Sequence, residues 1–358
     1  MHKKRVWIAS GGTGGHLYPA QSLAEELLEV SNTIEVLFIG GGLATNPYLD
    51  RDRFPFQQVS AAPFHGISFA SIGSCWRMGK GICESLYWMK KLPPDLIVGF
   101  GSYLAVPPLA AGCVTGVPIL LHEADSLLGR ANSWFAPFAK KIGVVFPHAG
   151  RSLGEKAVCT HMPLRKGYSL EELSREEAMT YFGLRDSREI LLVMGGSQGA
   201  DMCNQVAEYI QGVSQVVHLS GKKANPALIA DAYRKKGIYA IVKPFEPKMQ
   251  YAWRVADGWI GRAGSSTLAE ALAFEVPGLL IPYPHATGGH QELNAQFFCK
   301  TIGGGVMLRE KEITPSSFDR HFHQIWSHRS VLKQAMRAYK RESTRRFFSE
   351  LVWEALYE

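Results

Sequence analysis

The chain has 358 residues, of which 46% are hydrophobic and 20% are charged, and its formal net charge at pH 7 is +7. This composition excludes a disordered chain, and the length suits two globular domains better than one core. The positive charge favours anionic partners, such as phosphates, acidic lipids or nucleic acids, without choosing among them. The six cysteines are spread along the chain and form no CxxC pair, which indicates neither a zinc site nor a disulfide framework and favours a reduced cytosolic compartment.

Short apolar segments alternate with helix-like segments through the first half of the chain. We expect strands at residues 6–9, 34–39, 96–98, 119–121 and 156–159, and an amphipathic helix at 19–30. This alternation predicts an α/β fold with a parallel sheet covered by helices. Residues 97–121 carry no charge and are long enough to span a bilayer. Their glycines and prolines favour a strand, a loop, a helix and a second strand instead.

The same pattern restarts in the second half. A strand-like run at 189–194 leads into a glycine loop, as residues 5–10 do. Residues 109–120 also align without gaps to residues 268–279, where Leu-Ala and Val-Pro pairs recur at the same spacing. We therefore predict two doubly wound domains, residues 1–163 with a C-terminal helix at about 342–358, and residues 164–341. In such folds ligands bind beyond the carboxyl ends of the strands.

Three glycine-rich loops follow predicted strands: residues 11–16 (GGTGGH), 99–103 (GFGSY) and 195–199 (GGSQG). Glycines let the backbone approach a ligand closely, and amides at a helix start attract phosphate. Neither the GxGxxG nor the Walker pattern is complete, which disfavours an NAD enzyme or a P-loop NTPase. A plain tight turn explains any one loop, whereas all three together fit a cleft that holds two phosphate-bearing ligands.

Polar side chains mark two further predicted helix starts in the second half. Ser265, Ser266 and Thr267 can hold a diphosphate, and Glu270 one turn later can accept from both ribose hydroxyls. His290 and Gln291 can hydrogen-bond sugar hydroxyls. The alternatives are a solvated helix residue for Glu270 and caps or surface groups for the others.

Taken in order, the segments 11–16, 195–200 and 261–270 resemble the MurG family of peptidoglycan N-acetylglucosaminyltransferases, over residues 5 to about 300. The resemblance implies the GT-B fold, with two Rossmann-like domains facing a cleft. It implies inverting transfer of N-acetylglucosamine from UDP-GlcNAc to lipid I, giving lipid II, with no cofactor and no metal. It also implies a peripheral position on the cytoplasmic side of the inner membrane. The implied partners are an anionic membrane surface and possible cell-wall synthesis or division proteins, and no nucleic acid.

The resemblance also assigns roles by position. The UDP-GlcNAc site would comprise Thr13, Gly14, Gly15, Asp125, Arg165, Ser197, Glu246, Ser265, Ser266, Thr267, Leu268, Ala269, Glu270, His290 and Gln291. The acceptor diphosphate would meet Gly14, Gly15, Gly101, Ser102 and Tyr103. His16 would be the catalytic base, because an ordinary imidazole, with a pKa of about 6.5, is able to accept a proton at cytosolic pH. The alternative is a structural or phosphate-binding histidine.

The chain departs from the family pattern at two places. Ala124-Asp125 stands where the family usually has Gln-Asn, and ionised Asp accepts hydrogen bonds but does not donate them. Ser102 stands where the family usually has glycine. These departures put one sugar or acceptor contact and the second glycine loop in question.

Aromatic and basic residues are interleaved between residues 64 and 92. This pattern predicts a membrane-docking patch that contains Ile67, Phe69, Trp76, Lys80, Trp88, Lys90 and Lys91. The alternative is core packing of an amphipathic helix.

Three other functions remain open from the sequence. A UDP-GlcNAc 2-epimerase shares the two-domain architecture but acts without an acceptor, and another GT-B transferase would use the same loops. A basic nucleic-acid-binding protein is favoured only by the charge and leaves the glycine loops unexplained.

Overall fold

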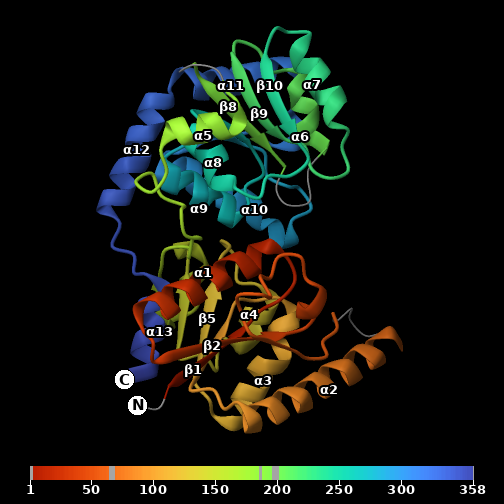
Figure 1. Ribbon diagram of the computed structural model, residues 1–358, viewed down its shortest axis with the longest axis vertical. Coiled ribbons are helices and arrows are strands. Elements are labelled where there is room, and N and C mark those ends of the chain that lie inside the picture. Colours follow the sequence, from red (N-terminus) through yellow and green to blue (C-terminus); the bar gives the residue numbers. More distant parts are fainter. Residues whose placement is uncertain (1–2, 64–68, 185–187, 196–200, 358) are drawn as a thin grey trace. The chain divides into compact units, whose positions relative to one another are not determined.

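The computed structural model describes residues 3–63, 69–184, 188–195 and 201–357 (Figure 1). Contacts within the chain divide it into two compact units. Unit 1 comprises Met1–Arg165 and Arg345–Glu358, and unit 2 comprises Lys166–Thr344. The C-terminal segment therefore belongs to the same unit as the N-terminus, and each unit is described below by itself.

Unit 1 contains a seven-stranded parallel sheet in the order β3-β2-β1-β4-β5-β6-β7. Its strands are β1 (Lys4–Ala9), β2 (Ile34–Gly40), β3 (Phe56–Gln58), β4 (Leu96–Gly99), β5 (Ile119–Glu123), β6 (Lys141–Val144) and β7 (Ala157–Cys159). Its helices are α1 (Gly14–Val30), α2 (Phe69–Lys91), α3 (Val106–Thr115), α4 (Arg130–Phe135) and α13 (Phe348–Tyr357). The strand order reverses between β1 and β4, so the loops after these two strands start side by side.

Unit 2 repeats this winding with a six-stranded parallel sheet in the order β10-β9-β8-β11-β12-β13. Its strands are β8 (Ile190–Met194), β9 (Gln215–Leu219), β10 (Tyr239–Lys243), β11 (Gly258–Gly261), β12 (Gly278–Leu280) and β13 (Gly305–Met307). Its helices are α5 (Arg175–Phe182), α6 (Asp201–Gln205), α7 (Pro226–Arg234), α8 (Met249–Val255), α9 (Ser265–Phe274), α10 (His290–Phe297), α11 (Pro315–Ser327) and α12 (Arg329–Glu342). The reversal here lies between β8 and β11.

The structure confirms the internal repeat that the sequence predicts. Helices α3 and α9 each lead from a switch-point strand to the next strand of the sheet, and both end on a residue in the left-handed region. That residue is Gly116 (φ 75°) in unit 1 and Glu275 (φ 56°) at the aligned position of unit 2. A non-glycine residue is strained there. Glu275 is held in place because its buried carboxylate accepts from Arg337 (2.6 Å) and Lys340 (3.2 Å) on α12.

The uncharged segment 97–121 forms the expected strand, turn, helix and second strand: β4, a 3-10 turn at Tyr103–Ala105, α3 and β5. Its apolar character follows from burial on both faces of a parallel sheet, where no side of a strand meets water. In the part of the chain that the structure describes, no helix combines the length and apolar character needed to cross a bilayer.

The sheet of unit 1 has an apolar core on each face. One core joins the sheet to α1 and α13, and the other joins it to α2, α3 and α4. Helix α13, drawn in blue beside the N-terminal strands in Figure 1, contributes Phe348, whose ring packs 5.0 Å from that of His122 at the end of β5. The C-terminal helix is thus part of the support beneath the carboxyl ends of the unit 1 strands.

A buried histidine ties β9 to two helices of unit 2. His218 is 0% exposed, with Nδ1 2.9 Å from the Tyr233 hydroxyl and Nε2 3.0 Å from Oδ1 of Asn204. Because the amide oxygen only accepts, Nε2 carries the proton and Nδ1 accepts from Tyr233. Burial lowers the pKa of His218 to about 3.

This lowered pKa predicts a specific pH dependence of stability. The unfolded chain protonates the imidazole below a pKa of about 6.5, whereas folded His218 stays neutral, so stability present above that pH is lost as the pH falls toward 3. We expect His218→Gln to remove up to about 1.4 kcal/mol per pH unit from the slope of unfolding free energy below pH 6. Urea unfolding at pH 7.5 and 5.5 measures the slope, with exposed His323→Gln as control. Equal slopes for His218→Gln and the parent chain would contradict the assignment.

Candidate functional site

The glycine loops after β1 and β4 contact each other at the switch point of unit 1. Gly12 (φ 87°) and Gly101 (φ 80°) both lie in the left-handed region that glycine tolerates. A Cβ on Gly12 would lie 3.3 Å from Oγ of Ser102, and one on Gly101 would lie 3.3 Å from Cδ2 of His16. Side chains at these positions would therefore be strained and crowded. Asn46 fixes the first loop by donating to the Gly12 carbonyl at 2.7 Å.

His16 lies in the first turn of α1, with its ring against the second loop. The helix begins at Gly14, so Gly14, Gly15 and His16 all belong to its first turn, after the N-cap residue Thr13. Nδ1 of His16 is 3.4 Å from Oγ1 of Thr13, and the half-buried ring borders Gly101. If Nδ1 donates to Thr13, Nε2 is the nitrogen able to accept a proton.

A buried carboxylate that the sequence did not single out organises the floor of this region. Glu123, at the end of β5, is 5% exposed and accepts from the Asp125 amide (3.1 Å), the Gly129 amide (2.8 Å) and Nδ2 of Asn132 (2.9 Å). Burial raises the pKa of Glu123 to about 7 although these donors oppose the shift. The only sequence signal was the polar pair His122-Glu123 at the end of an apolar strand. Asp125 is thus anchored through its backbone amide.

Ser102 occupies a backbone conformation that is normally reserved for glycine. Its φ is 67° and its ψ is 145°, and its hydroxyl is 3.4 Å from the Leu104 amide. A side chain in this region strains the backbone by about 1–3 kcal/mol. The departure from the family pattern at this position is therefore also a point of strain, next to the exposed Tyr103.

Arg165 is the last residue of the first segment of unit 1, two residues past the predicted boundary. Its guanidinium carbon lies 4.4 Å from the ring centroid of Tyr18 on α1, within cation–π range. The structure therefore brings Arg165 close to the helix that carries His16.

The start of α9 is the candidate phosphate site of unit 2. Gly264 is the N-cap, Ser265 is buried, and Ser266 and Thr267 are half-buried, so backbone amides and hydroxyls share one helix end. Oγ of Ser266 is buried without a partner among the described residues. Leu268 is 3% exposed, which leaves only its backbone for a ligand, and Ala269 is half-buried.

Glu270 and Glu246 each make contacts with other side chains of unit 2. Glu270, half-buried on α9, accepts from the Trp253 indole at 2.7 Å, which excludes a purely solvated carboxylate. Glu246 is 1% exposed and accepts from Lys243 Nζ (2.7 Å), the Lys248 amide and the Tyr181 hydroxyl (both 2.8 Å). Burial acts to raise the pKa of Glu246, but these donors outweigh it and the pKa is lowered. A ligand near Glu246 would therefore meet its backbone.

His290 and Gln291 open helix α10, after Gly288 and Gly289 in left-handed conformation. Oε1 of Gln291 accepts from the Tyr283 amide at 2.9 Å. The third glycine loop is described only as far as Gly195. The predicted site residue Ser197 lies outside the described residues.

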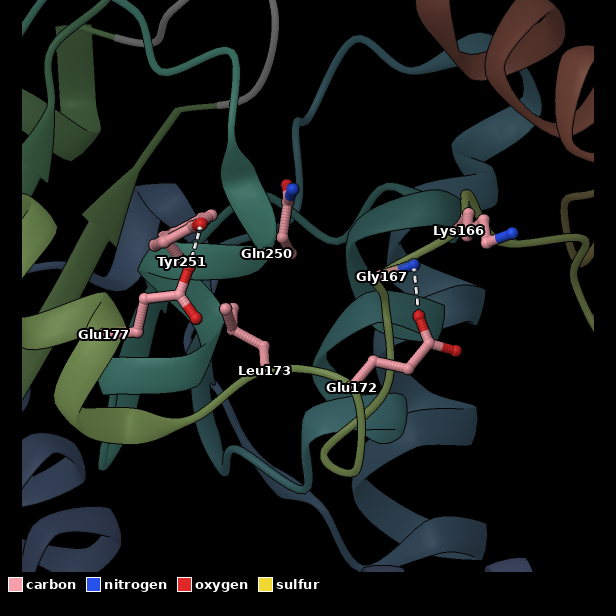
Figure 2. Close-up of a pocket in the computed structure, with 7 residues that line it drawn as sticks. All are labelled: Lys166, Gly167, Glu172, Leu173, Glu177, Gln250 and Tyr251. Carbon is pink, nitrogen blue, oxygen red and sulfur yellow. Dashed lines mark hydrogen bonds between the residues drawn. The ribbon is translucent and has the colours of Figure 1, made fainter.

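Figure 2 shows a cavity of about 280 Å³ in unit 2, lined by Lys166, Gly167, Glu172, Leu173, Glu177, Gln250 and Tyr251. Glu172 accepts from the Gly167 amide (2.7 Å) and Glu177 from the Tyr251 hydroxyl (2.6 Å). None of these residues is a predicted site residue, and two carboxylates disfavour a phosphate ligand. Among residues 3–63, 69–184, 188–195 and 201–357, no cluster of histidine, cysteine, aspartate or glutamate is suited to a metal ion.

Helix α2 carries only part of the predicted membrane patch. Trp76 (68% exposed) and Tyr87 (55%) face outward, with Lys80 and Lys91 within 6 Å of their ring centroids at 5.7 and 5.9 Å, and Lys90 is exposed. Trp88 is only half-buried and packs against the apolar core of unit 1, so it offers less surface to a membrane than Trp76 does. Ile67 and the side chain of Phe69 lie outside what the structure describes.

Comparison with known proteins gives consistent matches over both units. Residues 6–144 match the glycosyltransferase family 28 N-terminal domain, and residues 190–351 match the family 28 C-terminal domain. The UDP-N-acetylglucosamine--N-acetylmuramyl-(pentapeptide) pyrophosphoryl-undecaprenol N-acetylglucosamine transferase of Protochlamydia amoebophila is 41% identical, covering 98% of this chain and 95% of that protein. The Halothermothrix orenii protein of the same name is 33% identical, covering 94% of each.

Solved structures share the GT-B fold. MurG of Acinetobacter baumannii superposes with a TM-score of 0.77 at 23% identity, covering 99% of each chain. Os79 of O. sativa in complex with UDP gives a TM-score of 0.72 at 12% identity, again covering 99% of each. At these identities the likeness concerns the fold alone.

The strained serine leads to a stability prediction. We expect Ser102→Gly to raise the melting temperature of unit 1 by about 2–4 °C, because glycine adopts the φ of 67° without the steric strain of a side chain. Ser102→Ala keeps a Cβ and should give no such rise. Calorimetry of the three proteins tests this, and a glycine variant no more stable than the alanine variant would contradict strain at this position.

Proposed function

The chain belongs to glycosyltransferase family 28, and from that premise we propose that it transfers N-acetylglucosamine from UDP-GlcNAc to lipid I, the undecaprenyl-diphosphate-linked N-acetylmuramoyl-pentapeptide, giving lipid II. The observation that carries the proposal is the 41% identity, over nearly the whole chain, to a transferase of that name. The two contacting glycine loops of unit 1 and the helix start of unit 2 support it, because two diphosphate-bearing substrates need two such sites.

The donor site is assigned mainly to unit 2. The amides and hydroxyls of Ser265, Ser266 and Thr267, with the backbone of Leu268 and Ala269, would hold the diphosphate at the positive end of α9. Glu270 would accept from the ribose, and His290 and Gln291 would bind the sugar. The backbone at Glu246 would line the base, and Ser197 would add a contact. Thr13, Gly14, Gly15, Asp125 and Arg165 are the donor contacts assigned to unit 1.

The acceptor site is assigned to the paired loops of unit 1. Backbone amides of Gly14, Gly15, Gly101, Ser102 and Tyr103 would surround the diphosphate of lipid I, next to the start of α1. Gly101 permits this close approach because it has no side chain to meet the His16 ring.

In this reaction the acceptor hydroxyl attacks the anomeric carbon from the face opposite UDP, which inverts the configuration. His16 takes the hydroxyl proton on Nε2, while Thr13 holds Nδ1. Negative charge develops on the departing UDP, and the amides at the start of α9 stabilise it electrostatically. Within unit 1, Glu123 fixes the backbone after β5 by accepting from the Asp125 and Gly129 amides.

The exposed patch of α2, which consists of Trp76, Lys80, Tyr87, Lys90 and Lys91, would dock on an anionic membrane. Docking brings the site to a lipid-borne acceptor at the cytoplasmic face of the inner membrane, where cell-wall synthesis and division proteins are possible partners. This surface distinguishes the transferase from an epimerase, which has no lipid substrate to reach.

The direct test is transfer of labelled GlcNAc from UDP-GlcNAc to a short-chain lipid I analogue, with chelator in place of added metal. We expect lipid II analogue as the product. UDP-GlcNAc epimerisation without transfer would overturn the proposal in favour of the epimerase.

His16→Ala should lower turnover about a hundredfold or more, because a general base contributes at least that much, while UDP-GlcNAc affinity stays close to that of the parent chain. Steady-state kinetics and calorimetric titration measure the two effects. His148→Ala, at an exposed histidine of the same unit, is the matched control. Turnover that survives in His16→Ala would remove His16 from the base role.

The double variant Trp76→Ser with Tyr87→Ser should lose most binding to vesicles of anionic lipid, because its two outward-facing aromatic side chains are gone. Sedimentation with vesicles at low salt measures binding. Phe138→Ser removes a 65% exposed aromatic elsewhere on unit 1 and should bind as the parent chain does. Equal retention of the double variant would show that α2 is not the docking surface.

A further inference from the structure

We propose that two adjacent charged residues, Arg309 and Glu310, act with Arg262 as positioning residues that hold the sugar-binding end of the donor site. They follow β13 and do not belong to any predicted contact set. The proposal rests on the proposed function, because it takes Gln291 as the group that reads the N-acetylglucosamine. These three charged residues would set the orientation of the Gln291 side chain.

Arg262, directly after β11, uses its guanidinium to fix the chain that leaves β12. Nη1 lies 3.2 Å from the carbonyl oxygens of both Ile281 and Pro282 and 2.7 Å from Oε2 of Glu310. The guanidinium also lies over the Tyr283 ring at 5.4 Å. The Arg262 guanidinium thus contacts the main chain of Ile281 and Pro282 and the side chain of Tyr283.

Glu310 balances the charge of that cation. The Arg262 side chain is 11% exposed and that of Glu310 is 29% exposed, so water screens the pair only weakly. Removal of the carboxylate charge would leave a largely buried guanidinium without an ionic partner, which is strongly unfavourable. The guanidinium would then have to move toward water or find another partner, and the main chain that it holds would move with it.

The chain that Arg262 holds is joined directly to the sugar-binding residue. The Tyr283 amide donates to Oε1 of Gln291 at 2.9 Å, which orients the side-chain amide of Gln291. On the other side, the fully buried Asn294 of α10 donates to the Ala263 carbonyl at 3.2 Å. These contacts connect α10 to the segment after β11 at two points. Arg262 is linked to Gln291 through the chain at Tyr283, and its neighbour Ala263 is linked to Asn294. Ala263 directly precedes Gly264, the N-cap of α9, so these contacts adjoin the proposed phosphate site.

Arg309 fastens α10 from the same short segment. Its Nε and Nη2 lie 3.0 and 2.6 Å from Oε1 of Glu292, the residue after Gln291. Glu310 therefore holds the chain after β12 through Arg262, and Arg309 holds the start of α10 through Glu292. The two neighbours fix both sides of the Tyr283–Gln291 hydrogen bond.

The test separates positioning of the sugar from general stability. We expect Glu310→Gln to raise KM for UDP-GlcNAc about tenfold while kcat changes less than about twofold, because one oriented hydrogen bond to the sugar is lost. The dissociation constant of UDP, which lacks the sugar, should stay within about twofold of the parent value. Glu292→Gln, at the more exposed pair, should give a rise of the same kind but smaller, about threefold.

Glu189→Gln is the matched control, because it removes an ion pair with Arg329 in the same unit, away from α10. It should leave KM unchanged. Gln291→Ala serves as reference and should raise KM at least as much as Glu310→Gln.

The outcomes are distinct. An unchanged KM in Glu310→Gln and Glu292→Gln, beside a raised KM in Gln291→Ala, would overturn the positioning role and leave the proposed function intact. Equal weakening of UDP and UDP-GlcNAc would show a structural role only and would also overturn it. A parent chain that binds UDP but not UDP-GlcNAc would overturn the proposed function and this inference with it. If Glu310→Gln does not fold, Glu292→Gln alone decides between these outcomes.

Discussion

The reversal of strand order in each parallel sheet is the constraint on which the rest of the site depends. Neighbouring parallel strands whose connections run in opposite directions leave a crevice at their carboxyl ends. In unit 1 the loops after β1 and β4 lie at this crevice. In unit 2 the carboxyl ends of β8 and β11 lie side by side, and helix α9 follows β11. The first two loops are in such close contact that a side chain on Gly12 or Gly101 would be crowded by Ser102 or His16. The fold itself therefore places the backbone amides of these two loops close together.

A site of this kind would attract anionic ligands mainly through fixed backbone dipoles and would need few formal charges. The amides at the starts of α1 and α9 point outward from their helices, and each helix dipole adds to their attraction for phosphate. Two sets of charged side chains instead stabilise the backbone near these amides. Glu123 does so beneath the loops of unit 1, and Arg262 with Glu310 does so beside α9. Both sets are buried enough for their interactions to be strong.

The two units place different residues at equivalent backbone positions in the left-handed region. Where unit 1 ends its switch-point helix on Gly116, unit 2 uses Glu275 and stabilises it with two cations from α12. Where a flexible glycine would fit in the second loop, this chain has Ser102 at a positive φ. A duplicated fold therefore does not require duplicated side chains, since a strained backbone persists when neighbouring contacts hold it.

The sequence alone determined the elements whose signals are local. Unbroken apolar runs fixed the strands at residues 6–9 and 96–98, since a strand buried on both faces leaves no polar alternation. The uncharged segment 97–121 was resolved by its glycines and prolines, and the spacing shared by residues 109–120 and 268–279 revealed the repeat.

Only the tertiary structure decided which side of a helix is buried and which distant groups meet. Trp88 and Trp76 look alike in the sequence, yet Trp88 is half-buried against the core and Trp76 is exposed, because packing against the rest of unit 1 decides which side of the helix is covered. The partners of Glu270, Glu123 and Arg262 come from segments that no local pattern connects, namely Trp253, Asn132 and Glu310. Such pairings arise when the sheet brings separate loops to one edge, so they belong to the fold and not to any stretch of sequence.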